Sequence, residues 1–113
     1  MVRTMEEEGH LTIQSTVDQR NRTARLSLHG ELDLNGTDAV SRKLDEFAAG
    51  DVDTLLLDAS GLTFLDSSGL RTLLTGREQF AAKGGQFKVV DASAAVARVL
   101  EMTGTREMLE GTE

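Results

Sequence analysis

The 113-residue sequence contains no cysteine, no proline, no tryptophan and no tyrosine. Without cysteine the chain can form neither a disulfide framework nor a reactive thiolate, and only two distant histidines remain as nitrogen ligands for zinc. Four phenylalanines are the only aromatic residues, so the chain lacks the stacking platforms that bind single-stranded nucleic acid. These absences argue against thiol, zinc and base-stacking functions.

The charge balance and the hydropathy exclude further classes of protein. The chain has 19 acidic and 12 basic residues and a net charge of −7, whereas a nucleic-acid-binding protein needs a basic face. No apolar run approaches the roughly 20 residues that a membrane helix requires, and residues 1–8 do not resemble a signal peptide. We therefore expect a cytoplasmic protein that meets a basic protein surface or a nucleotide-dependent partner, not nucleic acid or membrane.

Hydrophobic periodicity predicts one domain over residues 11–113, preceded by a flexible lead-in at residues 1–10 that carries three glutamates and little apolar surface. Apolar and polar residues alternate over residues 11–17 and again, most regularly, over residues 24–32. This pattern is typical of two antiparallel strands that form a hairpin with one face toward water.

The rest of the chain alternates between strand and helix patterns. The expected elements are a helix from 35–38 to Gly50, a buried strand at 54–58, a helix from near Ser67 to Ala82, a strand at 87–90 and a helix from Ser93 to Gly104. The tail, residues 105–113, is expected to add a short strand through Met108 and Leu109. Such alternation implies parallel strands joined by crossover helices. The predicted fold class is α/β, with a small mixed sheet and helices mainly on one face.

The most informative stretch is Asp66-Ser67-Ser68-Gly69-Leu70, which lies between the buried strand and the helix that follows it. Aspartate and serine favour helix starts because their side-chain oxygens accept hydrogen bonds from the first free N–H groups of the helix. The same N–H groups, together with the helix dipole, accommodate a phosphate. A serine at this point can therefore serve as a helix cap or as the acceptor of a phosphoryl group.

The residues around the two serines do not fit an enzyme. A nucleophile elbow needs glycine where Leu65 stands, and His10 and His29, the only histidines, lie in the lead-in and on a solvated strand face. Asp58 ends an expected parallel strand, as the phosphoacceptor of a receiver domain does, but the acidic pair of receivers is missing after the first strand. We interpret Asp58 as a strand-end cap, and expect no catalysis, no metal and no cofactor.

The serine motif, preceded by Asp58-Ala59-Ser60-Gly61-Leu62-Thr63-Phe64-Leu65, resembles the signature of the STAS domain family, and more narrowly that of the bacterial anti-sigma factor antagonists. Gly30-Glu31-Leu32-Asp33 and Glu101-Met102-Thr103-Gly104 resemble two further family elements and stand in matching order. The resemblance covers residues 11–105 and implies the STAS fold. The family commonly continues with a strand and a further helix, for which residues 105–113 leave little room.

The resemblance implies a phosphorylation-controlled binding protein. The unphosphorylated form is expected to bind, as a monomer, an anti-sigma factor that is also an ATP-dependent serine kinase, which releases a sigma factor for transcription. Phosphorylation then ends the complex, and a serine phosphatase resets it. The alternative is a STAS scaffold, or an accessory or ligand-binding module of a signalling assembly or transport system.

The same resemblance implies roles for five residues. Ser67, the first serine after the aspartate, corresponds to the phosphoacceptor, and Ser68 beside it is expected to act as a helix-cap hydroxyl. Asp33 corresponds to a family aspartate near the phosphoacceptor loop, although local capping of a turn would also favour aspartate there. Asp66 is expected to bond the loop backbone, and Gly69 to allow close approach of the partner. All five are expected to contact the partner.

Overall fold

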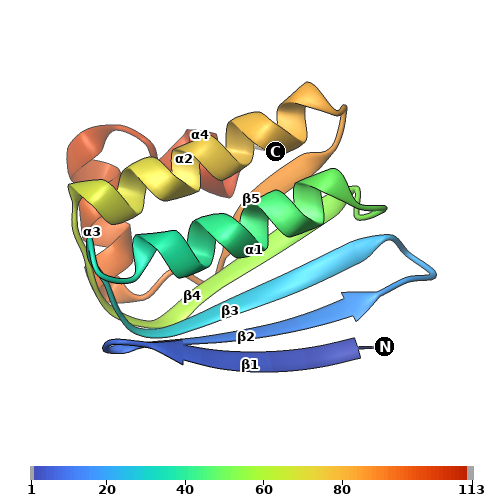
Figure 1. Cartoon of the computed structure of the whole chain (residues 1–113). Helices are drawn as coiled ribbons and strands as arrows, with labels where there is room; N and C mark the ends of the chain where they lie inside the picture. The colour runs from blue at the N-terminus through green and yellow to red at the C-terminus, as the bar shows by residue number, and fades with distance from the viewer. Residues whose placement is uncertain (1, 112–113) are drawn as a thin grey trace.

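The structure is a computed structural model that describes residues 2–111, and its centre is a five-stranded sheet whose strands lie side by side in chain order (Figure 1). The strands are β1 (Val2–Glu8), β2 (Leu11–Asp18), β3 (Thr23–Leu32), β4 (Thr54–Leu65) and β5 (Gln86–Val90). The first two strand pairs are antiparallel and the last two are parallel. The helices are α1 (Thr37–Ala49), α2 (Ser67–Ala82), α3 (Ala94–Thr103) and α4 (Arg106–Glu110).

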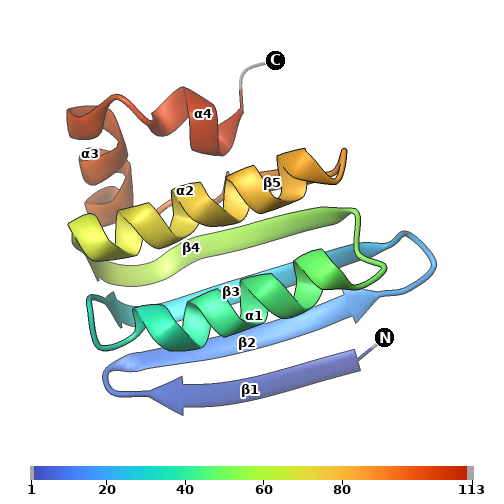
Figure 2. The same ribbon diagram turned by 45° about the horizontal axis from the view of Figure 1, so that its top comes forward.

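One face of the sheet carries the core. Along β3, Ala24, Leu26 and Leu28 are fully buried, whereas the residues between them face the other side, as the alternation predicts. α1 and α2 lie side by side across the buried face (Figure 2). Full burial of each leucine there contributes about 1.5–3 kcal/mol to the stability of the fold. The expected fold, a mixed sheet with helices mainly on one face, is confirmed. Within residues 2–111 no helix is long and apolar enough to cross a bilayer.

The N-terminal segment differs from its expected form. Residues 2–8, taken from the sequence as part of a flexible lead-in, form β1 and pair with β2 from Val2↔Val17 to Glu8↔Leu11. The hydroxyls of Thr4 and Ser15 share a hydrogen bond across the pair. The expectation failed because an edge strand is held mainly by backbone hydrogen bonds, so its side chains need not alternate between apolar and polar.

The C-terminal tail is also different from its expected form. Residues 106–110 form the helix α4, not a strand, and Leu109 is fully buried against the core. Arg106 lies 2.9 Å from carboxylate oxygens of both Glu101 and Glu110, which ties α4 to α3 and to its own last turn. A five-residue helix is too short to show a helical period in sequence, so the buried leucine alone suggested a strand.

β4 is longer than the strand expected at 54–58, and it continues to Leu65 after irregularities in its pairing with β3. Asp58 therefore lies within the strand, on the face without helices, and not at a strand end as expected. Its carboxylate accepts hydrogen bonds from the backbone N–H and hydroxyl of Ser60, at 2.9 and 2.7 Å, and from Arg25 at 2.9 Å. Partial burial works to raise the pKa of Asp58, but these hydrogen bonds together hold it below its usual value.

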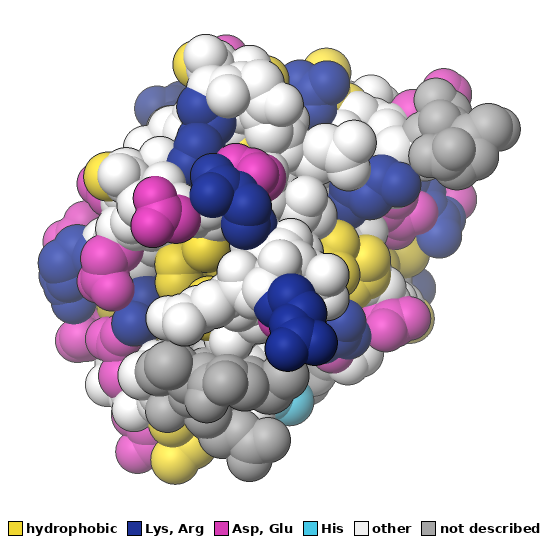
Figure 3. Space-filling view, turned by 90° about the vertical axis from the view of Figure 1, so that its right-hand side faces the viewer, with side chains coloured by type: hydrophobic (Ala, Val, Ile, Leu, Met, Phe, Trp, Pro, Cys, Tyr) yellow, Lys and Arg dark blue, Asp and Glu magenta, His cyan; other side chains and the backbone are white. Residues whose placement is uncertain are grey.

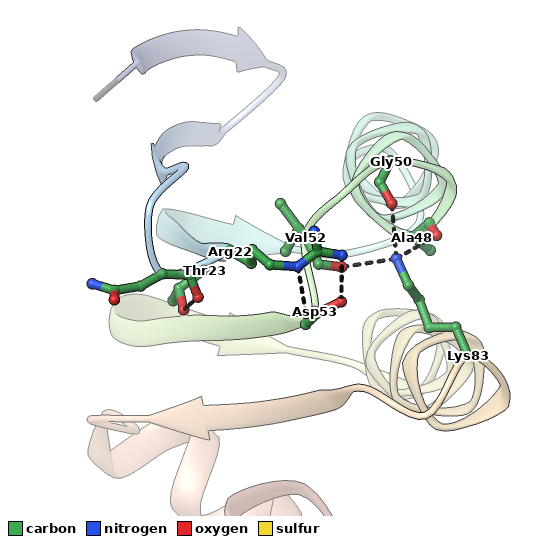
Figure 4. Close-up of polar contacts among 8 residues, drawn as sticks. Arg22, Thr23, Ala48, Gly50, Val52, Asp53 and Lys83 are labelled. Atoms are coloured by element: carbon green, nitrogen blue, oxygen red, sulfur yellow. Dashed lines mark hydrogen bonds and ion pairs between the residues drawn. The ribbon is translucent and has the colours of Figure 1, made fainter.

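A lysine at the end of α2 joins the far ends of the two long helices (Figure 4). Lys83 Nζ donates to the backbone carbonyls of Ala48, Gly50 and Val52, at 2.9, 3.0 and 2.8 Å. The last carbonyls of a helix have no partner within the helix. A cation at this end can donate hydrogen bonds to them, and it is stabilised by the negative end of the helix dipole. Figure 3 looks onto this edge of the molecule, where basic and acidic side chains are mixed and no patch of one sign dominates.

Replacing Lys83 by methionine is expected to lower the free energy of unfolding by about 1–2 kcal/mol, because it removes charge-assisted hydrogen bonds but keeps most of the aliphatic stem. Urea unfolding followed by circular dichroism measures the change. Arg98→Met is the matched control, since Arg98 is exposed on α3 and bonds no group in the described part of the chain. Equal midpoints for the two variants would show that the lysine contacts contribute nothing.

Candidate functional site

The ends of β3 and β4 bring the expected site residues to one edge of the sheet. Leu32 and Leu65, the last residues of these parallel strands, are register partners, and the Asp66 N–H donates to the Leu32 carbonyl at 3.3 Å. Asp33 and Asp66 are the next residues of each strand. α2 begins directly after Asp66 and α1 a few residues after Asp33, so both helix starts lie at this edge, on the left in Figure 1.

Asp66 is the N-cap of α2. Its backbone is extended (φ −103°, ψ −174°), and its carboxylate accepts hydrogen bonds from the Gly69 N–H at 2.9 Å and from the Ser68 hydroxyl at 2.6 Å. Desolvation works to raise the pKa of Asp66, but the hydrogen bonds from Ser68 and the helix N–H groups outweigh it and lower the pKa. Asp66 therefore ends the strand and starts the helix as a charged cap.

Asp66→Ala is expected to lower the free energy of unfolding by roughly 1–2 kcal/mol, as loss of an N-cap does. Because the folded-state pKa lies below the unfolded value of about 3.9, the charged cap stabilises the protein fully above that pH. The contribution is lost as the pH falls through the lower folded pKa. Urea midpoints of both proteins measured from pH 7 down to about pH 2 should therefore draw together below about pH 4, and a difference that stays constant over the whole range would contradict this assignment.

The two serines differ in what their hydroxyls do. Ser68 was expected to provide the helix-cap hydroxyl, but the cap is Asp66. The Ser68 hydroxyl is partly buried and donates to the Asp66 carboxylate, so it supports the cap. Ser67 is exposed, and no group within residues 2–111 hydrogen-bonds its hydroxyl. One hydroxyl is thus committed to the fold and the other is available at the surface.

Ser67 opens onto a hollow of about 350 Å³ between the starts of α1 and α2. Its lining residues are Leu34, Thr37, Ser67, Ser68, Arg71 and Thr72. Leu34, at the rim, is 73% exposed, which is unusual for a large apolar side chain and suits a contact surface. Sequence reasoning missed Leu34, Thr37 and Arg71, although the four-residue spacing between Ser67 and Arg71 on a helix could have indicated the last of them.

Asp33 lies in the turn beside this hollow but does not line it. Its carboxylate accepts from the Asn35 N–H at 3.0 Å, and its carbonyl accepts from the Gly36 N–H at 3.0 Å. These are the bonds of a local turn that leads into α1. The structure thus places Asp33 at the same edge as Ser67 and gives its side chain a turn-forming contact.

Gly69 is buried, and its missing side chain serves the fold. A Cβ there would lie 2.7 Å from Leu65 Cδ1 and 2.8 Å from the Leu32 carbonyl oxygen. The backbone oxygen cannot move aside easily, so only glycine lets α2 begin this close to the strand ends. Gly69 was expected to let a partner approach closely, but the segments that approach it in the structure are the ends of β3 and β4.

No catalytic arrangement surrounds the exposed serine among the described residues. His29 packs over Gly61 within the sheet, where a Cβ on Gly61 would clash with the His29 ring, and His10 lies in the turn between β1 and β2. Within residues 2–111 no cluster of three histidine or carboxylate side chains could hold a metal ion. The features that distinguish this edge are an available hydroxyl, a capped helix start and a shallow hollow.

Comparison with known proteins agrees with this geometry. A family model described as "Mlab, STAS domain" matches residues 15–110. The anti-sigma F factor antagonist of Paenibacillus polymyxa is 30% identical over 95 residues, which are 83% of this chain and 81% of the relative. The anti-sigma-F factor antagonist RsfB of Mycobacterium tuberculosis is 31% identical over 93 residues, covering 82% of this chain and 75% of the relative.

A solved structure shows the same fold. The crystal structure of an anti-sigma factor antagonist from Mycobacterium paratuberculosis superposes with a TM-score of 0.74 at 26% sequence identity, and the match covers 88% of this chain and 86% of that one. A family model that spans most of the chain and relatives that cover more than four-fifths of it lead to one conclusion. The chain belongs to the STAS domain family, in the group of the anti-sigma factor antagonists.

Proposed function

We propose that this protein is a phosphorylation-controlled antagonist of an anti-sigma factor. In its unphosphorylated form it binds, as a monomer in the cytoplasm, an anti-sigma factor that is also a serine kinase, and the sigma factor held by that kinase is released. The kinase then transfers the γ-phosphoryl group of ATP to the Ser67 oxygen, and ADP and a proton leave. The complex separates, and a serine phosphatase later restores the hydroxyl. The names of the relatives support the antagonist role.

The observation that carries the proposal is the difference between the two neighbouring serines. The Ser67 hydroxyl is exposed and has no partner among residues 2–111, so a kinase can take its proton without breaking a contact of the fold. The Ser68 hydroxyl would first have to leave the Asp66 carboxylate, 2.6 Å away. Losing a hydrogen bond to a charged group costs about 1.5–3 kcal/mol, which favours Ser67 as the phosphoacceptor.

The charge of a phosphate explains how modification separates the complex without unfolding the domain. Phosphorylation adds about −1.5 to −2 charge at neutral pH, next to Asp66 and in a chain of net charge −7. The start of α2 tolerates a negative group, so the fold survives. An interface shaped around a small neutral hydroxyl does not tolerate it, because the phosphate meets steric and electrostatic repulsion there.

We further propose that the protein acts by binding alone. No histidine or other base hydrogen-bonds Ser67 within the described residues, and a serine nucleophile needs such a base. The hollow beside Ser67, with Leu34 exposed at its rim, offers surface for a protein partner. Leu34, Asp66 and Ser67 are the residues that we expect the partner to contact first.

The proposal is tested with the purified chain and the serine-kinase anti-sigma factor of its source cell. With ADP the two should elute together in size-exclusion chromatography. After incubation with ATP they should elute separately, with phosphate on Ser67 by mass spectrometry. A sample phosphorylated beforehand is the control and should not bind. Failure to form a complex with either nucleotide would refute the antagonist role.

A further inference from the structure

The hollow beside Ser67 contains an arginine, Arg71, to which the proposed phosphorylation cycle assigns no role. Arg71 lies on α2 one turn after Ser67, and its side chain is exposed. No carboxylate, carbonyl or aromatic ring in the part of the chain that the structure describes forms a hydrogen bond, ion pair or ring interaction with its guanidinium. An arginine without an internal partner, four residues from an uncommitted serine, is available to an anion that arrives at that serine.

Helix geometry brings these two side chains together. Residues four apart on a helix have Cβ atoms about 5–6 Å apart on the same face. Each Cα–Cβ bond tilts toward the start of the helix, so the Arg71 side chain leans back over the turn that carries Ser67. That both residues line one hollow agrees with this orientation.

The other groups of the hollow leave this role to Arg71. Among the lining residues it is the one charged side chain, and the neighbouring hydroxyls already donate elsewhere. Thr37 donates to the Leu34 carbonyl at 3.0 Å, and Thr72 donates to the Ser68 carbonyl at 3.1 Å. The Gly69 N–H at the helix start is also taken, because it donates to Asp66. A phosphate on Ser67 therefore meets one uncommitted cation.

We infer that Arg71 is the intramolecular partner of phosphorylated Ser67, and this inference rests on the proposed phosphorylation of that serine. The planar guanidinium donates two parallel hydrogen bonds to phosphoryl oxygens, a geometry that lysine cannot supply. Phosphorylation thereby changes the surface twice. It adds a doubly charged group at Ser67 and withdraws a free cation from the area offered to the anti-sigma factor.

The test installs phosphoserine at position 67 by genetic encoding, so that no kinase is needed, and follows its second ionisation by phosphorus NMR. A nearby cation favours the doubly charged phosphate, so the apparent pKa of the phosphate should rise in the Arg71→Gln variant. Opposite charges a few ångströms apart shift pKa values by 1–3 units, and solvent exposure reduces this to an expected rise of about 0.5–1 unit. Arg71→Lys should give a smaller rise than Arg71→Gln.

Arg98→Gln is the matched control, because it removes one exposed, unpartnered positive charge from α3 instead of from the hollow. It should leave the phosphate titration within about 0.2 unit of the parent, as expected for a screened distant charge. Equal titrations for Arg71→Gln and the parent would overturn the inference, and so would an equal shift with Arg98→Gln. These outcomes concern the pairing alone, whereas the proposed function stands or falls with phosphorylation by the kinase.

Discussion

Ser67→Ala is expected to retain the fold, to bind the anti-sigma factor and to accept no phosphate from it, so that the complex persists in the presence of ATP. The hydroxyl that is removed is exposed and unpartnered among residues 2–111, and the helix cap is Asp66, so stability should change by less than about 0.5 kcal/mol. Mass spectrometry after incubation with kinase and ATP, together with affinity measurements before and after, tests all three statements.

Two companion variants distinguish the role of the serine from that of its neighbour. Ser67→Asp should weaken binding, but less than phosphorylation does, because a carboxylate carries less charge and fewer acceptor oxygens than a phosphate. Ser68→Ala should still be phosphorylated, although it loses the hydrogen bond to Asp66. Phosphate on Ser67→Ala, together with none on Ser68→Ala, would show that Ser68 is the acceptor.

Leu73→Ala is expected to lower the free energy of unfolding by roughly 2–5 kcal/mol, because it leaves a cavity in the middle of the core. Leu73 is fully buried on the face of α2 that packs onto the sheet. Against a total stability of about 5–15 kcal/mol, such a loss removes a large share of the stability of the domain. Denaturant midpoints measured by circular dichroism give the value.

Leu74→Ala is the matched comparison, one residue further along the same helix. If the apolar pattern of the sequence alone determined the effect, truncating Leu73 and Leu74 would lower the free energy of unfolding equally. Leu74 is only half-buried at the edge of the core, however, so its truncation should cost less than that of Leu73. A larger loss at Leu74 than at Leu73 would mean that α2 is rotated relative to the sheet.

The elements with chemical signals at their ends could be predicted from the sequence closely. α2 runs from Ser67 to Ala82 as expected, because a capping aspartate precedes it and Gly84-Gly85 follows it. α3 begins after Ser93, whose hydroxyl accepts from the Val96 N–H, and it ends at Gly104 in the left-handed conformation. Caps of this kind are local, so the residues that form them are sufficient to locate the helix ends.

The features that sequence reasoning missed depend on contacts between distant segments. α4 is only five residues long, and none of residues 4–8 of the edge strand β1 is buried, so neither element shows a hydrophobic period in the sequence. The three carbonyls that receive Lys83 lie more than thirty residues before it. The hollow beside Ser67 likewise joins the starts of two helices. No local pattern encodes such pairings, so they became visible only in the folded chain.

β1 has a consequence for how molecules of this protein meet in concentrated solution. It is an outermost strand of the sheet, so one side of its backbone faces solvent with N–H and C=O groups that another extended chain could pair with. Glu6, Glu7 and Glu8 stand consecutively along that margin, and an approaching copy would set its own three carboxylates against them. At neutral pH this repulsion opposes strand-to-strand aggregation. Acid neutralises these carboxylates and high salt screens them, so the repulsion becomes weaker. The unpaired backbone groups of β1 are then accessible to another strand, and fibrils can begin there.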